Sequence, residues 1–247
     1  MTIRLAGRGV RVVLLDIEGT TTPIAFVHDV LFPFARTHLD AFLRTHADDA
    51  ALTEVRRLLA REYADDLERG ETVPESAFDS SGAIVPYVVW LMDRDRKSPG
   101  LKLLQGHIWE DGYRLGQLRG QVYPDVPPAI RRWRAAGMRV AIYSSGSELA
   151  QRRLFESTEH GDLTPLLSGY FDTGVGAKVA PESYARIAAA LDVPPAAILF
   201  VSDVTRELTA ARAAGVQVVL SVRPGNSAQA DSDQFEHVQS FEELGAE

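Results

Sequence analysis

Two carboxylates, Asp16 and Glu18, follow four apolar residues at positions 12–15 and flank the start of a glycine- and threonine-rich segment. An unbroken apolar run bounded by turn residues is typical of a strand buried on both faces of a parallel sheet. Open α/β sheets bind ligands at the carboxyl ends of such strands, so the position of Asp16 favours a role in ligand binding. Because one residue separates them, both side chains would share a side if the extended backbone continued. A strand that simply ends in a polar turn is the alternative.

A second polar segment, Ser144-Ser145-Gly146-Ser147, follows the apolar residues 140–142 and Tyr143. Hydroxyls and backbone amides at a strand-to-helix turn can bind phosphate oxygens. A cluster that only caps the next helix is the alternative for this segment alone.

Three charged residues extend the pattern. Asp203 follows another apolar strand and is a candidate magnesium ligand opposite Asp16, since magnesium prefers oxygen donors. Glu207, one helical turn further on, could orient a metal-bound water or Lys178. Lys178 follows a glycine-rich loop and could pair with Asp16 and with a substrate phosphate. A helix cap at Asp203 and a surface lysine at Lys178 are the alternative interpretations.

The elements needed to bring these residues together alternate in the second half of the chain. Apolar runs predict strands at 139–143, 169–173, 197–201 and 216–222, and the intervening periodicity predicts helices at 127–136, 148–155, 181–191 and 206–214. Strands alternating with helices in this way indicate a parallel, helix-flanked sheet.

No convincing strand lies between about Val27 and Val122, where the pattern is helical. Helices are expected at 51–63 and 101–119, with a further helix after Pro23 that Pro33 should end, kink or restart. The charged run at 93–97 is typical of solvated surface. The sequence therefore predicts an all-helical insertion after the first strand of the sheet.

Composition limits the classes of function. The net charge of −8 argues against nucleic acid or an anionic membrane as the main partner. With no cysteine, the chain has no disulfide, thiolate metal ligand or cysteine nucleophile. The N-terminal residues lack a signal-peptide core and no apolar run is long enough to span a bilayer, so we expect a cytoplasmic protein.

The order strand-Asp16, strand-Ser144, loop-Lys178, strand-Asp203 resembles the four motifs of the haloacid dehalogenase superfamily. Most phosphatases of that superfamily have Asp-x-Asp in the first motif, whereas this chain has Glu18 at the second position. The segments DIEGTTTPIAFV, LQGHIW, IYSSGS, DVTRE and VRPGN instead resemble the enolase-phosphatase (acireductone synthase) family of methionine salvage. This resemblance covers nearly the whole chain and is weakest at about 47–82.

The resemblance implies roles for individual residues. Asp16 would be the nucleophile that takes the phosphoryl group, and Lys178 would offset charge. Glu18 would act as acid and base, with its backbone carbonyl as a magnesium ligand beside Asp16 and Asp203. The phosphate would be bound by Ser144, Ser145, Gly146 and Lys178, with Glu207 acting indirectly.

The resemblance also implies a fold and a reaction. A Rossmann-like core domain would comprise residues 1–24 and 123–247, and a helical cap domain residues 25–122, in which Gln105 and His107 are candidates for substrate contact. With Mg²⁺ as cofactor, the enzyme would convert 2,3-diketo-5-methylthiopentyl 1-phosphate through its enol to the acireductone and phosphate. We expect a monomer, although no feature of the sequence decides the oligomeric state.

Other functions are compatible with the same motifs. Another magnesium-dependent phosphatase or a phosphomutase of the superfamily would keep the whole set of residues. A haloacid dehalogenase needs no metal, so the acidic Glu18 and Asp203 argue against it. A non-catalytic binding module would be expected to have lost the nucleophile or the metal acid, and both are present.

Overall fold

The computed structural model describes residues 3–78 and 83–247, and the chain forms two compact units. The first unit comprises Met1–Val27 and Arg119–Glu247, and the second comprises His28–Leu118. Among the described residues, no helix is both long and apolar enough to cross a membrane.

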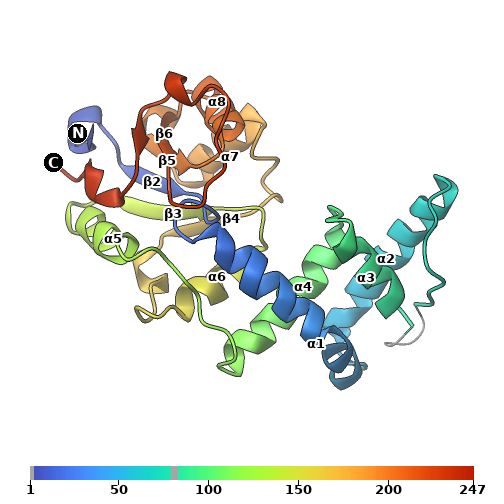
Figure 1. The fold of residues 1–247 in the computed structure, drawn as a ribbon. Helices are drawn as coiled ribbons and strands as arrows, with labels where there is room; N and C mark the ends of the chain where they lie inside the picture. Colours follow the sequence, from blue (N-terminus) through green and yellow to red (C-terminus); the bar gives the residue numbers. More distant parts are fainter. Residues whose placement is uncertain (1–2, 79–82) are drawn as a thin grey trace. The chain divides into compact units, whose positions relative to one another are not determined.

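The first unit is built on a six-stranded parallel sheet of order β4-β3-β2-β5-β6-β7 (Figure 1). Its strands are β2 (Val12–Leu15), β3 (Arg139–Tyr143), β4 (Gly169–Phe171), β5 (Ile198–Ser202), β6 (Gln217–Ser221) and β7 (His237–Val238). Two further strands, β1 (Ile3–Arg4) and β8 (Leu244–Gly245), form a separate parallel pair. The strands expected from the apolar runs are present, whereas β1, β7 and β8 are too short to give a pattern.

The strand β2 lies at the centre of the six-stranded sheet, where its residue Leu15 is in register with Ile142 of β3 and Val201 of β5. All four residues of β2 are fully buried, as expected for a strand covered on both faces. Because the strands are parallel, the polar residues that follow β2, β3 and β5 gather at one edge of the sheet.

Four helices flank this sheet: α5 (Val126–Ala135), α6 (Glu148–Glu156), α7 (Pro181–Ala190) and α8 (Thr205–Ala213). Figure 1 shows α5 and α6 on one side of the sheet and α7 and α8 on the other. Apolar residues of α7 and α8 pack on alternate residues of the strands, including Val12, Leu14, Ile198 and Phe200. Short 3₁₀ turns occur at Ala6–Arg8, Thr164–Leu166, Pro195–Ala197, Ser232–Gln234 and Phe241–Glu243.

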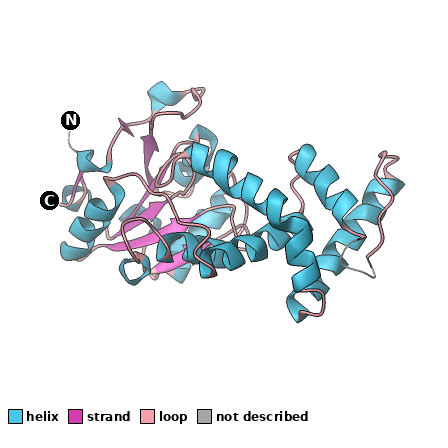
Figure 2. Cartoon of the chain, turned by 60° about the horizontal axis from the view of Figure 1, so that its bottom comes forward, coloured by secondary structure: helices cyan, strands magenta, loops and turns pink. Residues whose placement is uncertain are grey.

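The described part of the second unit contains helices and loops but no strand (Figure 2). A π-helical segment, Phe26–Leu31, leads into α1 (Phe32–Thr45), and α2 (Ala50–Glu68), α3 (Val85–Asp93) and α4 (Pro99–Arg114) follow. These helices enclose an apolar core of their own. The helical insertion predicted after the first strand of the sheet is therefore confirmed.

The start of α1 and the end of α4 can be compared with the helices expected from the apolar periodicity. Pro33 lies in the first turn of α1, directly after the π-helical segment, and the backbone at Leu31 is helical, so the chain changes from π- to α-helix there without a break. The helix predicted at 101–119 ends at Arg114 instead. The chain turns back after that residue, and the Leu118 N–H donates to the Gly112 carbonyl at 3.1 Å. Leu118 is buried by this turn, so the apolar pattern continues although the helix does not.

Candidate active site

Asp16 lies directly beyond the carboxyl end of β2, beside the ends of β3 and β5. Its backbone N–H donates to the Val201 carbonyl at 3.0 Å, which continues the pairing of the two strands. The side chain is buried, and its Oδ1 accepts a hydrogen bond from the Ile17 N–H at 2.7 Å. The strand register thus places Asp16 next to Ser202 and Asp203.

The ammonium of Lys178 joins Asp16 to Glu207. Its Nζ lies 2.7 Å from Asp16 Oδ1 and 2.7 Å from Glu207 Oε2, and 10% of its side chain is exposed. Burial disfavours the charged ammonium, but the charges of the two carboxylates outweigh it and raise the pKa of Lys178. An ammonium has three N–H donors, so a lysine held by two carboxylates can still bind an anion.

Ser202, the last residue of β5, was not predicted to take part in the site. Its Oγ lies 2.9 Å from Glu207 Oε2 and 3.2 Å from Asp16 Oδ2, and it accepts the Val204 N–H at 3.2 Å. One hydroxyl proton can serve only one of the two carboxylates at a time. Ser202 therefore links the two acids that flank Lys178. Its only signal in the sequence was a polar residue at the end of an apolar strand.

Asp203 lies against the backbone of Gly19. A Cβ at Gly19 would be 2.4 Å from Asp203 Oδ2, and Gly19 has a φ of +67°, so both the space and the backbone conformation require glycine. Burial, followed by the charge of Asp16, raises the pKa of Asp203 to about 7. The same two causes raise the pKa of Glu207. Asp16, Asp203 and Glu207 therefore present three carboxyl groups to one ammonium.

This charge imbalance suits a hard cation. Among the described residues, no three or more His, Cys, Asp or Glu side chains form a metal site by themselves. Magnesium, however, is usually held by one or two carboxylates, with waters and substrate phosphate completing its octahedron. Asp16 and Asp203 supply that number of carboxylates, and a bound cation would offset both the burial and the charge of Asp16 that raise the pKa of Asp203. The residues present fit the predicted metal.

The loop after Asp16 is held by its own threonines and by a distant segment. Thr21 Oγ1 donates to the Asp16 carbonyl at 3.0 Å. Asn226 Nδ2 donates to the Gly19 carbonyl at 2.9 Å, and Arg223 Nε donates to the Thr20 carbonyl at 3.3 Å. These contacts give the VRPGN segment a structural role that its sequence alone did not indicate.

Glu18 is half-buried within this loop, and its backbone forms an isolated β-bridge with Thr22. The extended backbone of β2 ends at Leu15, before either carboxylate. Asp16 still continues the pairing with β5 through its N–H, whereas the side chain of Glu18 is placed by the turn.

Only one of the polar residues in the turn after β3 is needed to cap the next helix. Ser147 caps α6, since its Oγ accepts the Ala150 N–H at 3.2 Å. Ser144 is buried, and its N–H donates to the Phe171 carbonyl, while Ser145 is exposed and Gly146 half-buried. Capping therefore accounts for Ser147 and leaves Ser144, Ser145 and Gly146 at the start of a helix, where anions bind favourably.

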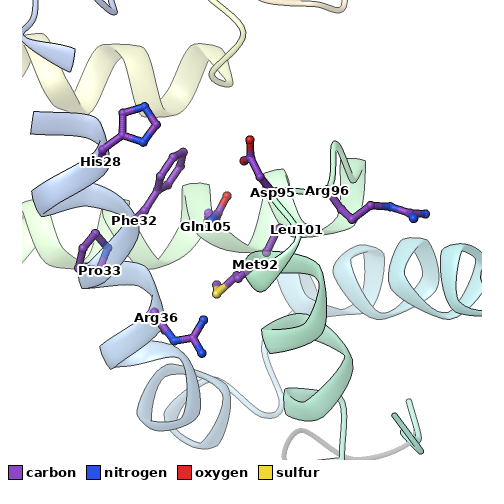
Figure 3. A pocket seen from close by; sticks show the side chains of 9 residues that line it. All are labelled: His28, Phe32, Pro33, Arg36, Met92, Asp95, Arg96, Leu101 and Gln105. Carbon is purple, nitrogen blue, oxygen red and sulfur yellow. The ribbon is translucent and has the colours of Figure 1, made fainter. Parts of the chain in front are cut away.

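Gln105 and His107, the two candidates for substrate contact in the second unit, lie in different surroundings. Gln105 lines a cavity of about 290 Å³ within that unit, beside apolar side chains that include Phe32, Met92 and Leu101 (Figure 3). His107 is not among the residues lining that cavity, and its Nδ1 lies 3.9 Å from Glu110 Oε2 on its own helix.

A parallel sheet with an aspartate at the end of its central strand, followed along the chain by a serine turn, a buried lysine and a second aspartate, defines a haloacid dehalogenase-like hydrolase. The family model of that description matches residues 10–215. Enolase-phosphatase E1 of Synechococcus elongatus is 52% identical over 231 residues, covering 94% of this chain and 96% of that protein. The chain therefore belongs to the enolase-phosphatase E1 family.

Two further relatives extend the comparison. A probable bifunctional methylthioribulose-1-phosphate dehydratase/enolase-phosphatase E1 of Populus trichocarpa is 46% identical over 95% of this chain and 47% of that protein. The crystal structure of the UTR4 protein from Saccharomyces cerevisiae is similar with a TM-score of 0.73 and 33% sequence identity, covering 94% of this chain and 99% of that chain.

Proposed function

We propose that this enolase-phosphatase acts on 2,3-diketo-5-methylthiopentyl 1-phosphate, with Asp16 as nucleophile. The observation that carries the proposal is the pairing of the Lys178 ammonium with Asp16 and Glu207 at the strand ends. Phosphoryl transfer requires a positioned nucleophile and compensation of negative charge, and this arrangement offers both.

The proposed reaction has two displacements. An oxygen of Asp16 forms a bond to phosphorus while the bond between phosphorus and the substrate oxygen breaks, and Glu18 protonates the leaving oxygen. Water then attacks the aspartyl phosphate, Glu18 takes its proton, and inorganic phosphate leaves Asp16 free. Lys178 offsets charge during both displacements.

Glu18 is also our proposed base for enolisation, the step before phosphoryl transfer. Enolisation needs a base within hydrogen-bonding reach of the proton on the carbon next to the carbonyl, and the enolate oxygen takes up a proton to give the enol. Glu18 is half-buried and lies two residues from the nucleophile, in the loop that follows β2, which supports this assignment.

Asp16, Asp203 and the Glu18 carbonyl are the proposed ligands of Mg²⁺. The ion would polarise substrate oxygens and offset phosphate charge. The burial of the Asp203 carboxylate against Gly19 supports its role as a ligand. Glu207 would act indirectly, through the hydrogen bonds that it shares with Lys178 and Ser202.

Ser144, Ser145 and Gly146 are the proposed phosphate-binding residues, together with Lys178. Residues 25–122 are the proposed cap domain, and residues 1–24 and 123–247 the proposed catalytic domain. Of the two cap candidates, Gln105 has the stronger support because it lines a cavity beside apolar side chains suited to an alkylthio group. The location of His107 outside that cavity weakens its case.

The Populus relative supports the choice of substrate. Its printed name combines a methylthioribulose-1-phosphate dehydratase with an enolase-phosphatase, and this chain covers about half of its length. Loss of water from a ketopentose phosphate gives a diketone phosphate after tautomerisation, which is the substrate proposed here.

The test is to incubate the purified chain and Mg²⁺ with the diketo phosphate, and to follow acireductone absorbance and phosphate release together. We expect stoichiometric formation of both products. Phosphate release without acireductone would indicate a general phosphatase, and return of the phosphoryl group to another position of the product would indicate a phosphomutase. Either result would contradict the proposal.

A further inference from the structure

The loop that carries Lys178 has an unusual set of hydrogen bonds. Four consecutive carbonyls, from Val175 to Lys178, each accept a bond from a side chain. The donors are Arg186 Nη1 to Val175 at 2.8 Å, Tyr143 Oη to Gly176 at 2.9 Å, Ser183 Oγ to Ala177 at 2.8 Å and Tyr184 Oη to Lys178 at 2.6 Å. A loop outside regular structure would ordinarily bond to water, so side-chain donors fix its path.

Three of the four donors come from the first two turns of α7, and the fourth comes from the end of β3. The side chains of Ser183, Tyr184 and Tyr143 are fully buried. The loop also approaches the helix closely, since a Cβ at Gly176 would lie 2.2 Å from Ser183 Oγ and its φ is +133°. The loop is therefore attached to the rigid core and not to the surface.

Tyr184 bonds to the residue that carries the ammonium. Its hydroxyl holds the carbonyl of Lys178 itself, and its ring lies edge-on to Tyr143, with the centroids 5.6 Å apart. Phe200 of β5 contacts both rings, with its ring centroid 5.2 Å from that of Tyr184 and 6.3 Å from that of Tyr143. A donor fixed within this cluster of three rings sets the position of the backbone from which the Lys178 side chain extends.

We propose that Tyr184 is a positioning residue for phosphoryl transfer, which fixes the Lys178 backbone so that the ammonium meets the nucleophile and the phosphate. Tyr143 and Ser183 assist by holding the two preceding carbonyls. The proposal rests on the function proposed above, because it assigns Lys178 to the transferred phosphate. Catalytic groups must be held within about 0.5 Å of their productive geometry, so the loss of one such bond affects rate more than fold.

Tyr184→Phe tests the proposal because it removes only the hydroxyl. Its matched control is Tyr170→Phe, since Tyr170 is also buried in the first unit and its hydroxyl has no hydrogen-bond partner among the described residues. We expect kcat/KM on a simple phosphate ester to fall about tenfold for Tyr184→Phe and to stay near the wild-type value for Tyr170→Phe. Equal values for the two variants would overturn the proposal.

Orthovanadate binding supplies a readout that a merely structural role would not change. Orthovanadate resembles the transferring phosphoryl group, and we expect calorimetry with Mg²⁺ to show about tenfold weaker binding to Tyr184→Phe at unchanged stoichiometry. This measurement needs no turnover, so it tests the positioning role even if the wild type fails on the diketo phosphate. Unchanged affinity would contradict the proposal.

A double-mutant cycle separates action through Lys178 from action elsewhere. In a Lys178→Arg background, the further loss caused by Tyr184→Phe should nearly disappear, because the group that it positions is already displaced. A full tenfold loss in that background would show that Tyr184 acts through another residue. If Tyr184→Phe does not fold, Ser183→Ala, which removes the bond to Ala177 and the contact with the Tyr143 hydroxyl, takes its place in each measurement.

Discussion

Each unit buries a cluster of charged side chains. Positive charge is in excess in one cluster and negative charge in the other. In the second unit, Asp66 is 1% exposed and bonds to Tyr87 at 2.7 Å, to Arg96 at 2.6 Å and to Arg69. In the first unit, Asp16 and Glu207 pair with Lys178, and the charges of all three act on the buried Asp203. One buried carboxylate thus faces two guanidinium groups in one cluster, whereas three buried carboxyl groups surround one ammonium in the other.

The directions of the pKa shifts follow from this difference. Burial opposes ionisation of Asp66, but hydrogen bonds from Tyr87 and Arg69 and the charge of Arg96 outweigh burial and lower the pKa of Asp66. Burial and the charge of Asp16 raise the pKa of Asp203 to about 7. The ion pairs of Asp66 stabilise the packing of the second unit. The excess of carboxyl groups around Lys178 costs stability and gives the first unit an affinity for cations.

The largest expected effect is that of Asp16→Asn on turnover. The amide keeps the size of the side chain but cannot attack phosphorus, so phosphate release should fall by about a thousandfold or more. Removing one negative charge from the overloaded cluster should leave the melting temperature unchanged or higher. Near-normal turnover by a folded Asp16→Asn protein would remove the assignment of the nucleophile.

Asp203→Asn should lower activity by about a hundredfold at a fixed magnesium concentration, because it removes one of the proposed carboxylate ligands. Titration with Mg²⁺ should show a much higher concentration for half-maximal rate. Full wild-type activity in the presence of a chelator would contradict the metal role.

Glu18→Asp should separate the two half-reactions. An aspartate is what most phosphatases of the superfamily carry there, so hydrolysis of a simple ester should fall by no more than about tenfold, whereas a carboxylate drawn back by one methylene would miss the substrate proton. Solvent deuterium exchange into the diketo phosphate, compared with phosphate release from a non-enolisable ester, measures the difference. Equal losses would place the enolisation base elsewhere.

Asp66→Asn should affect stability and not chemistry. Loss of the charge leaves Arg69 and Arg96 without their buried partner, at an expected cost of roughly 2 kcal/mol in the free energy of unfolding. The exposed neighbour Asp65 offers the control Asp65→Asn, which should be neutral. The kcat of Asp66→Asn at a temperature where it is fully folded should stay within about twofold of the wild type; a much lower kcat would give this cluster a functional role.

The last prediction concerns how the stability contributions of Asp203 and Asp66 depend on pH when no divalent cation is present. The raised pKa of Asp203 means that the folded state binds more protons than the unfolded state between about pH 4 and 7, so its contribution is lost as pH rises through that window. The lowered pKa of Asp66 means the reverse: its contribution is present above the unfolded pKa and is lost as pH falls.

Chemical unfolding at several pH values, with a chelator present, measures both contributions. Asp203→Asn should be more stable than the wild type at pH 8 by on the order of 2 kcal/mol and similar to it near pH 4. Asp66→Asn should be less stable than the wild type at pH 8 and approach it in acid. If both variants were more stable than the wild type at pH 8, or both less stable, the proposed contrast between the two clusters would be wrong.

The sequence predicted the elements whose pattern is local. The apolar runs identified β2, β3 and β5, and their polar ends drew attention to Asp16, Ser144 and Asp203, because parallel strands bring their carboxyl ends together. The structure joins Lys178 to Asp16, a pairing that depends on a loop position and that the sequence only permitted.

Other features depend on partners far apart in the chain and left no local signal. Asn226 reaches the Gly19 carbonyl across 207 positions, and Ser202 contacts Asp16 only when β5 lies beside β2. The charged run at 93–97 was expected to be solvated, yet Arg96 bonds to the buried Asp66. A charge next to other charges gives no sign of a buried partner 30 residues earlier.

The position of β2 has a consequence for the order of folding. This strand precedes the whole second unit, yet both of its neighbours follow it: β3 begins at Arg139 and β5 at Ile198. During synthesis, Val12–Leu15 must wait unpaired until those segments leave the ribosome, while His28–Leu118 is continuous and can collapse around its own apolar core first. Closing such long loops slows nucleation of the sheet. A chaperone that binds short apolar segments would find Val12–Leu15 exposed until late in synthesis.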